Sequence, residues 1–402
     1  MSKVSVIGAG TMGAGIAQVA AAGGWTVALL DVDAQVVESA IVAVRARFDR
    51  LVEKGRLAAG ERDAAVQRLQ GGIGPEAFLD CGLIVEAVVE RLDVKARVLA
   101  DAVRAAPPSA ILATNTSSLS IGQIGAAVGA APRTVGMHFF NPAPLMPLVE
   151  VVAGADTAPE CADRVTAVAR EWGKTPVRVR DTPGFIVNRV ARGYYLEPLR
   201  MFEEGVAGVD EIDRALKALG GFRMGPFELM DLIGVDVNYA VSQSVWRQLG
   251  EPARLRPSDT QRRLVEAGRL GRKSGRGCYA YDRDPPAPAL TFERRSFDLP
   301  EDLYRAVRRF SERATREAGS STEQLIFART LAAILNEAAL GLDERIASPA
   351  DIDTAMKLGV IYPHGPSAWA ERIGRPTVRH LLDTLNRHAK DQRFTAADWL
   401  AR

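Results

Sequence analysis

Residues 3–22 read KVSVIGAGTMGAGIAQVAAA, a short β-rich run, a glycine turn and a helical pattern in direct succession. This is the setting in which a GxGxxG motif binds a dinucleotide. Gly8 permits the tight turn, Gly10 lets the backbone approach a pyrophosphate, and Gly13 lets the helix pack closely on the strand. The phosphates are expected at the helix N-terminus, where unpaired backbone N–H groups favour an anion. The predicted cofactor-binding residues of the turn are Gly8, Gly10, Thr11, Met12 and Gly13.

An acid follows the next predicted strand. Residues 26–30 are β-rich and end at Asp31, where dinucleotide-binding proteins place a carboxylate that accepts hydrogen bonds from the adenosine ribose. Asp31 would repel a 2′-phosphate, and Val32 supplies no cation to hold one. The sequence therefore predicts NAD rather than NADP. The alternative is a glycine turn in a sheet protein that binds no nucleotide.

The composition is that of a globular protein with more than one domain. The chain has 402 residues, 47% of them hydrophobic and 25% charged, and at about 150 residues per domain this length predicts two or three domains. A net charge of +2 without a long Lys/Arg run argues against a nucleic-acid partner. No stretch reaches the ~18 apolar residues of a membrane span, and no secretion signal is recognised. Three scattered cysteines favour a reducing cytoplasm and no metal site; they are Cys81, Cys161 and Cys278.

Two further predicted strands end in polar side chains. Residues 83–88 lead into an acid and a helix, and residues 111–113 lead into TNTSS at 114–118. We expect these strands to form one parallel sheet, in which strand ends at one edge hold the reactive groups. The alternative is that the hydroxyls only cap a helix. The candidates at this edge are Glu90, Lys95, Asn115 and Ser117.

The stretch GMHFFNPAPLMPLVEVV at 136–152 is the strongest candidate for chemistry. His138 is one of four histidines and lies near the end of an apolar run, and Glu150 lies in LVEVV, which predicts a second buried strand. A buried carboxylate needs a partner. An imidazole suits it, because a carboxylate on one ring nitrogen leaves the other nitrogen free to take a proton. The alternative is a core histidine and an unrelated glutamate on an edge strand.

A predicted helix over residues 34–54 has several cations on its polar face. Charges at helical spacing usually form only a solvated face. If the substrate carries phosphates, these cations are the nearest candidates to bind them. They are Arg45, Arg47, Arg50 and Lys54.

From residue 184 onward the pattern is helical, and it repeats. At a shift of 140 residues the chain aligns with itself without insertions, which predicts a duplicated helical module. Asn188, a polar residue in the apolar run FIVNR, aligns with Ala328 in the second copy. We therefore predict that copy one contributes to the chemistry of the site and that copy two has a structural role. The aligned pairs include Arg189 with Arg329, Glu197 with Glu337, Ile212-Asp213 with Ile352-Asp353, Gly225-Pro226 with Gly365-Pro366, and Ile233-Gly234 with Ile373-Gly374.

The predicted fold class is an α/β Rossmann-type NAD-binding domain followed by two homologous all-α domains. The nucleotide-binding domain is expected over residues 1–183. Copy one is expected over 184–282, a proline-containing linker over 283–320, and copy two over 321–402.

The chain resembles the 3-hydroxyacyl-CoA dehydrogenase family. The motifs GAGTMGAGIAQ, IVEAVVER, NTSSLSI, GMHFFNPAP, LVEV, DTPGFIVNR, MGPFELMD and GRKSGRGCY are similar to those of the family, in its order, over residues 1 to about 282. Copy two resembles the extra C-terminal domain of longer bacterial members, including 3-hydroxyadipyl-CoA and 3-hydroxybutyryl-CoA enzymes of phenylacetate breakdown.

The resemblance implies roles for the candidate residues. His138 would be the catalytic base and Glu150 its orienting partner, with Ser117 and Asn188 holding the substrate's 3-oxygen. Three further residues would line the nicotinamide side of the cofactor: Glu90, Lys95 and Asn115.

The resemblance also implies a CoA contact, because Arg50 and Lys54 occupy the position where relatives carry basic residues near the nucleotide end of CoA. The chain departs from the pattern at Glu53, which replaces a basic residue, and at Pro147, where many relatives have lysine.

The implied activity is NAD-dependent oxidation of (S)-3-hydroxyacyl-CoA to 3-ketoacyl-CoA and its reverse, on short-chain or 3-hydroxyadipyl substrates. Such an oxidation needs a base at the hydroxyl while C3 gives hydride to the nicotinamide. Two alternatives stay open, a β-hydroxyacid dehydrogenase acting on a free acid and a non-catalytic NAD-binding protein of the same fold. Because short relatives dimerise, the expected assembly is a homodimer, or a monomer in which copy two replaces the partner, with no nucleic-acid or membrane partner.

Overall fold

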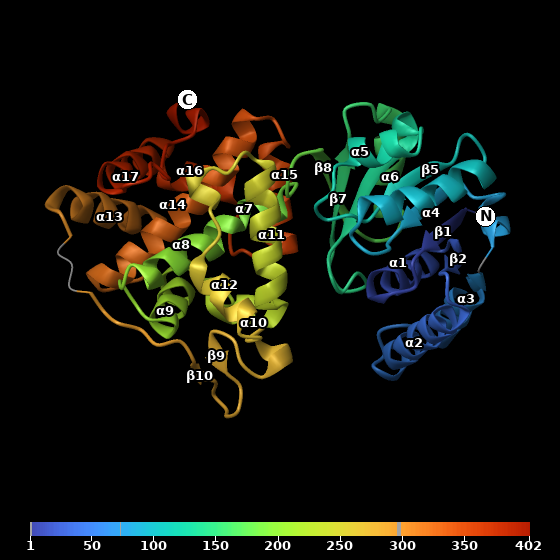
Figure 1. Cartoon of the computed structure of the whole chain (residues 1–402), viewed down its shortest axis with the longest axis horizontal. Helices are drawn as coiled ribbons and strands as arrows, with labels where there is room; N and C mark the ends of the chain where they lie inside the picture. The colour runs from blue at the N-terminus through green and yellow to red at the C-terminus, as the bar shows by residue number, and fades with distance from the viewer. Residues whose placement is uncertain (1, 73, 296–298) are drawn as a thin grey trace. The chain divides into compact units, whose positions relative to one another are not determined.

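The computed structural model describes residues 2–72, 74–295 and 299–402. It divides the chain into two compact units, Met1–Phe185 and Ile186–Arg402 (Figure 1). The first unit is an α/β domain and the second is helical, so the predicted fold class is confirmed. The two helical copies pack together as one unit.

The first unit contains an eight-stranded sheet in the order β3-β2-β1-β4-β5-β6-β7-β8. The first six positions have the Rossmann order, with the ligand crevice expected between β1 and β4, where the strand order reverses. The edge strand β3, LQGG, was not predicted because it lacks the residues that favour strands. The strands are β1 Lys3–Ile7, β2 Thr26–Leu30, β3 Leu69–Gly72, β4 Leu83–Glu86, β5 Ile111–Thr114, β6 Thr134–Phe139, β7 Leu148–Ala153 and β8 Thr175–Arg180.

The strands that precede the glycine turn, the polar loop and His138 are parallel, as predicted, whereas β7 and β8, for which no direction was predicted, run the other way. β7 pairs antiparallel with β6, and β8 runs parallel to β7, so both oppose the other six strands. The reason is the short connection over residues 140–147, because a parallel crossover needs about a dozen residues or more. The reversal sets His138 directly opposite Glu150 in the ladder.

Helices cover both faces of this sheet, as expected for strands that are buried on both sides. α1 Thr11–Ala22, α2 Ala34–Glu53, α3 Ala59–Gln67 and α6 Pro159–Glu171 share one apolar core with the sheet. α4 Leu92–Ala105, α5 Ile121–Ala127 and η1 Pro75–Phe78 share the core on the other face. Successive residues of β2 alternate between the two cores, with Val27 and Leu29 in the first and Ala28 and Leu30 in the second.

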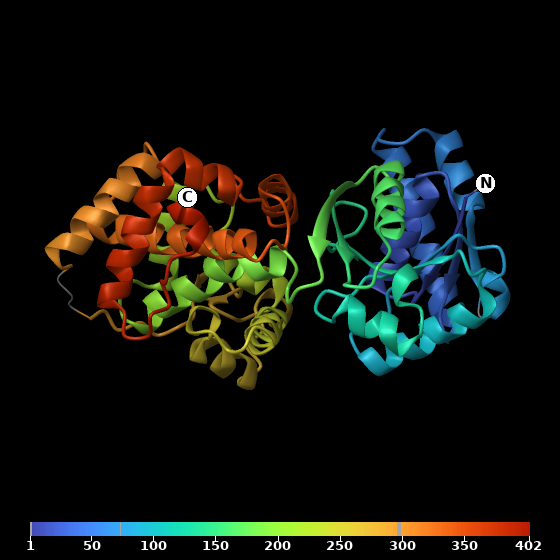
Figure 2. The ribbon, with the colours of Figure 1, turned by 90° about the horizontal axis from the view of Figure 1, so that it is seen from above.

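The second unit contains the two helical copies (Figure 2). Copy one has α7 Val187–Val190, α8 Arg192–Glu203, α9 Val209–Gly220, α10 Pro226–Ile233, α11 Val235–Gln248, η3 Ala253–Leu255, α12 Asp259–Glu266, η4 Arg272–Ser274 and the strand β9 Tyr279–Ala280. The strand β10 Ala287–Pro288 and the helix α13 Glu301–Ala314 follow. Copy two has α14 Ser321–Asp343, α15 Pro349–Gly359, α16 Pro366–Ile373, α17 Arg375–His388 and η5 Asp398–Ala401.

The bounds of the helices show the repeat. Adding 140 to the bounds of α10 and α11 gives those of α16 and α17. The caps repeat as well, because Asp213 accepts hydrogen bonds from the first N–H groups of α10, and Asp353 does the same for α16. The positions at which these helices begin and end are therefore determined by local features such as the aspartate caps, and not by the particular side chains in the interior of each copy.

The predicted linker over residues 283–320 contains a helix that was not expected. α13 buries Leu303, Ala306, Val307 and Phe310 against α14, α16 and α17. These residues have the spacing of one helical face, so the signal was present in the sequence. The prolines at 285–288 obscured it.

α14 is the one helix among the described residues that is long and apolar enough to cross a membrane by length and composition. Of its most apolar window, 83% is buried inside the protein. We therefore interpret α14 as a core helix of the second unit.

The two copies exchange buried ion pairs reciprocally. Arg189 of copy one binds Glu337 and Glu344 of copy two, and its Nε lies 2.7 Å from Glu337 Oε1. Arg329 of copy two binds Glu197 and Glu204 of copy one. These residues correspond at the shift of 140, so the interface has the reciprocity of a two-fold dimer interface.

Candidate active site

His138 and Glu150 form a buried pair on neighbouring strands. Nδ1 of His138 lies 2.7 Å from Oε2 of Glu150, and the glutamate has no exposed surface. The predicted partner of the buried carboxylate is therefore confirmed. Because the carboxylate holds Nδ1, Nε2 is the ring nitrogen that can exchange a proton.

The ring of His138 lies among aromatic side chains. The ring centroids of Phe140 and Phe185 are 4.6 and 5.8 Å from its own. Phe185 is buried and has φ +49°, a conformation that is strained for a bulky residue and is concentrated at functional sites. Sequence reasoning missed Phe185, although it follows Gly184 in the DTPGF motif.

Asn115 connects the end of β5 to the strand of His138. Its Oδ1 accepts a hydrogen bond of 2.8 Å from the backbone N–H of Phe139, the residue after the histidine. An oxygen must face that N–H, so the side-chain NH₂ of Asn115 faces away from it. The structure thus brings Asn115 and the backbone beside His138 together, as the sheet-edge prediction required.

Glu90 organises the polar loop after β5. Its Oε1 accepts hydrogen bonds from the hydroxyl of Thr116 at 2.7 Å and from the backbone N–H groups of Ser117 and Ser118 at 2.9 and 3.0 Å. Burial raises the pKa of Glu90, but the charge of Lys95 and these hydrogen bonds outweigh it and hold the pKa below its ordinary value. Glu90 therefore stays a carboxylate and fixes the loop that carries Ser117.

Lys95 lies behind Glu90 and is almost fully buried. Its Nζ is 2.8 Å from Oε1 of Glu86 and 3.2 Å from Oε2 of Glu90. Glu86, at the end of β4, also accepts a hydrogen bond of 2.6 Å from the Thr114 hydroxyl. Sequence reasoning named Lys95 but missed Glu86, whose signal was an acid inside the apolar run IVEAVV.

The glycine turn has the close contacts that GxGxxG predicts. Gly8 has φ +101°, and a Cβ there would lie 2.6 Å from the carbonyl oxygen of Ala87. A Cβ on Gly13 would lie 1.7 Å from the carbonyl oxygen of Gly8. A Cβ on Gly10 would meet no atom within 4 Å, so this glycine leaves open space at the N-terminus of α1, where no side chain caps the helix. These features fit a dinucleotide pyrophosphate. Thr11 and Met12 form the first turn of α1.

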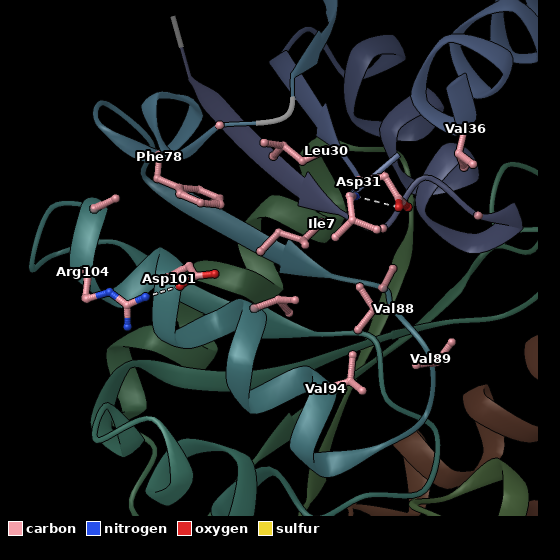
Figure 3. A pocket seen from close by; sticks show the side chains of 17 residues that line it. Ile7, Leu30, Asp31, Val36, Phe78, Val88, Val89, Val94, Asp101 and Arg104 are labelled. Carbon is pink, nitrogen blue, oxygen red and sulfur yellow. Dashed lines mark hydrogen bonds and ion pairs between the residues drawn. The ribbon is translucent and has the colours of Figure 1, made fainter. Parts of the chain in front are cut away.

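A cavity of about 760 Å³ opens beside this turn, where the strand order reverses (Figure 3). The ends of β1, β2 and β4 line it together with α4. Asp31 is fixed at its rim because its Oδ2 accepts a hydrogen bond of 2.8 Å from Ala9 N–H. Arg104 is the one cation that lines the cavity among the described residues, and it is paired with Asp101 on α4, away from Asp31. The lining therefore fits NAD and offers a 2′-phosphate no cation beside Asp31.

Arg50 and Lys54 lie at the C-terminal end of α2, where both are exposed. Neither forms an ion pair with a described residue. Arg47, one turn earlier, donates a hydrogen bond to Gln18, and burial together with the charge of Arg50 lowers the pKa of Arg47. The three cations thus cluster on one helix face.

Asn188 belongs to the second unit, in the short helix α7. It is partly exposed, and its backbone oxygen accepts a hydrogen bond of 2.9 Å from Nε of Arg192. Among the described residues, no group of three or more His, Cys, Asp or Glu is arranged to hold a metal ion.

The chain is similar to known proteins over its whole length. The sequence model "3-hydroxyacyl-CoA dehydrogenase, NAD binding domain" matches residues 3–182, and the model of the C-terminal domain of the same enzyme matches residues 184–281 and again 325–402. The chain is 39% identical to 3-hydroxyadipyl-CoA dehydrogenase of Escherichia coli K12, over 98% of this chain and 95% of that protein. A probable 3-hydroxybutyryl-CoA dehydrogenase of Deinococcus radiodurans is 39% identical, over 69% of this chain and all of that protein. The crystal structure of 3-hydroxybutyryl-CoA dehydrogenase from Escherichia coli K12 superposes with a TM-score of 0.89 at 38% identity, over all of this chain and 97% of that one.

Proposed function

The chain belongs to the 3-hydroxyacyl-CoA dehydrogenase family, and from this membership we propose how its own residues carry out the reaction. The protein is an NAD-dependent oxidoreductase that interconverts (S)-3-hydroxyacyl-CoA and 3-ketoacyl-CoA. One observation carries the proposed mechanism, the distance of 2.7 Å between His138 and Glu150 inside the sheet.

Bound NAD supplies the hydride acceptor. Nε2 of His138 takes the proton of the 3-hydroxyl group as C3 loses its hydride. The resulting imidazolium is buried, and Glu150 supplies the counter-charge that it needs. In the reverse direction His138 returns the proton to the 3-oxygen.

Two further side chains are proposed to stabilise charge on the 3-oxygen. Ser117 lies on the loop that Glu90 fixes, and Asn188 lies in α7, within the motif DTPGFIVNR. Fixed hydrogen-bond donors of this kind stabilise an oxyanion most when they need no reorganisation. Glu90, Lys95 and Asn115 are proposed to shape the nicotinamide side, since they tie β4, β5 and β6 together.

The nucleotide end of CoA is proposed to bind at Arg50 and Lys54. Both cations are exposed on one face of α2, without an acidic partner among the described residues. The mutual repulsion of Arg47 and Arg50 would be relieved by a phosphate group.

Copy two is proposed to replace the partner subunit of a dimer, so that the full-length chain is a monomer. The reciprocal pairs of Arg189 and Arg329 support this, because each arginine binds two glutamates of the other copy. The three cysteines are free and buried, which supports the cytoplasm as the proposed compartment.

The variant His138→Ala tests the mechanism. We expect kcat with acetoacetyl-CoA and NADH to fall at least ~100-fold, the usual scale for a lost general acid or base. The loss is read from NADH absorbance, with circular dichroism to verify the fold and free acetoacetate as the control substrate. Near-normal turnover of His138→Ala would remove the assignment.

A further inference from the structure

Arg192 is a buried arginine that has no carboxylate partner. It is the first residue of α8, is 4% exposed, and forms no ion pair with any described residue. Arg189, three residues earlier, is also buried but binds two glutamates. Burying a guanidinium group without a counter-ion costs free energy of folding. The two glutamates compensate for this cost at Arg189, whereas nothing described so far compensates for it at Arg192.

The groups around Arg192 are neutral. Its Nε donates to the backbone oxygen of Asn188 at 2.9 Å, and its Nη1 donates to the hydroxyl of Ser242 at 2.9 Å and to Oδ1 of Asn238 at 3.3 Å. The ring of Tyr195 lies 4.9 Å from the guanidinium carbon. Nη2 has no hydrogen-bond acceptor within the described part of the chain. Burial lowers the pKa of Arg192, but an arginine keeps its charge in proteins, so the uncompensated cation persists.

Copy two shows that the helical module does not need this polar cluster. At the shift of 140, Arg192, Asn238 and Ser242 correspond to Ala332, Val378 and Leu382, which are all buried. The helices α16 and α17 nevertheless have the bounds of α10 and α11. A module of this shape can therefore form without a polar cluster at these positions, so the cluster of copy one can serve a ligand.

We propose that Arg192 binds the terminal carboxylate of a dicarboxylic acyl-CoA substrate, and that it thereby selects 3-hydroxyacyl thioesters whose acyl group ends in an acid. The inference rests on the proposed function, in which Asn188 donates to the 3-oxygen. Guanidinium suits this role because its planar array of donors matches a carboxylate.

Arg192 lies beside the residue that is proposed to hold the 3-oxygen, because its Nε donates a hydrogen bond of 2.9 Å to the backbone oxygen of Asn188. A carboxylate bound by Nη2 would therefore belong to a short acyl chain, and the test uses a six-carbon chain.

Two substrates of equal length test the proposal. The full-length enzyme is assayed with NADH and either 3-oxoadipyl-CoA or 3-oxohexanoyl-CoA, in which a methyl group replaces the carboxylate. We expect the wild type to favour the adipyl thioester in kcat/KM. Arg192→Met is expected to lower kcat/KM for the adipyl thioester by ~100-fold, mainly through KM, the scale of breaking one buried charge pair. The variant should change the value for the hexanoyl thioester by less than ~3-fold, and Arg192→Lys should recover part of the adipyl preference.

Three other results are possible, and each of them contradicts a different part of the account. Equal losses on both thioesters in Arg192→Met would assign Arg192 a structural role. A wild type that uses both thioesters equally would contradict the specificity and leave the proposed function standing, and this comparison decides even if the variant does not fold. Turnover of neither thioester by the wild type would contradict the proposed function itself.

Discussion

Copy one and copy two have the same helices but different interiors. Asp213 and Asp353 cap equivalent helices in the same way, and the bounds of two helix pairs agree at the shift of 140. The buried polar residues Arg192, Asn238 and Ser242 of copy one are replaced in copy two by Ala332, Val378 and Leu382, and the partly exposed Asn188 is replaced by Ala328. The difference shows that helix caps and the spacing of apolar residues determine the helical structure of each copy. The polar residues inside a copy can change without changing that structure, and so can serve a function.

The first helix of each copy also differs. Copy two has the continuous helix α14, whereas copy one is interrupted at Ala191 between α7 and α8. The interruption lies between Asn188 and Arg192, the two residues that we associate with substrate. Copy two, in which the corresponding helix is continuous, is thus the copy to which we assign no catalytic or substrate-binding residue.

Removal of copy two should have the largest effect. A chain that ends at Asp282 loses α14, on which α8 and α9 pack, and leaves Arg189 without Glu337 and Glu344. We expect the shortened chain to form a dimer or an aggregate, because the exposed face is apolar and copy one can pair with a second copy of itself. Light scattering after size exclusion measures this against a monomeric full-length chain. If the shortened chain is instead a soluble monomer, copy two does not replace the partner subunit of a dimer.

A smaller effect is expected at Gly193, where α8 of copy one packs against α14 of copy two. A Cβ on Gly193 of α8 would lie 2.8 Å from the backbone nitrogen of Ile334 in α14. Gly193→Ala should therefore separate the helices and lower the free energy of unfolding by ~1–3 kcal/mol, the usual cost of overpacking.

The equivalent residue of copy two, Ala333, provides the matched control. Ala333→Gly should cost only the helix propensity of alanine, ~1 kcal/mol or less. Urea unfolding measures both variants. If Gly193→Ala instead stabilises the protein as a better helix former, the close packing at this position is wrong.

Much of the fold could be predicted from the sequence because local patterns encode it. The glycine turn, Asp31 and the repeat at 140 residues each have a physical reason that needs no tertiary structure. The antiparallel direction of β7 was not predicted, although the short connection over residues 140–147 rules out a parallel crossover between β6 and β7. α13 was missed because prolines nearby suggested a linker, although its apolar spacing was regular.

Site residues could be predicted from the sequence where a titratable side chain interrupts a run of apolar residues. His138 and Glu150 stand out in apolar runs, and the structure pairs them. Glu86 has the same signal, an acid in an apolar run, but its pairing with Lys95 depends on the tertiary fold. Phe185 has no such signal, because its contact with His138 appears only in the structure. Arg192 was overlooked because a buried arginine is informative only when its lack of an acidic partner is known.

The central claim is that copy one takes part in the chemistry and copy two only supports the fold. Its most direct test truncates the side chain at equivalent positions of the two copies. Asn188→Ala should lower kcat with acetoacetyl-CoA by ~100-fold, the scale of losing one donor to a developing oxyanion. Ala328→Gly, at the equivalent position of copy two, should leave kcat within ~2-fold and cost only ~1 kcal/mol of stability. Comparable losses of kcat in the two variants, measured on folded protein, would contradict the account.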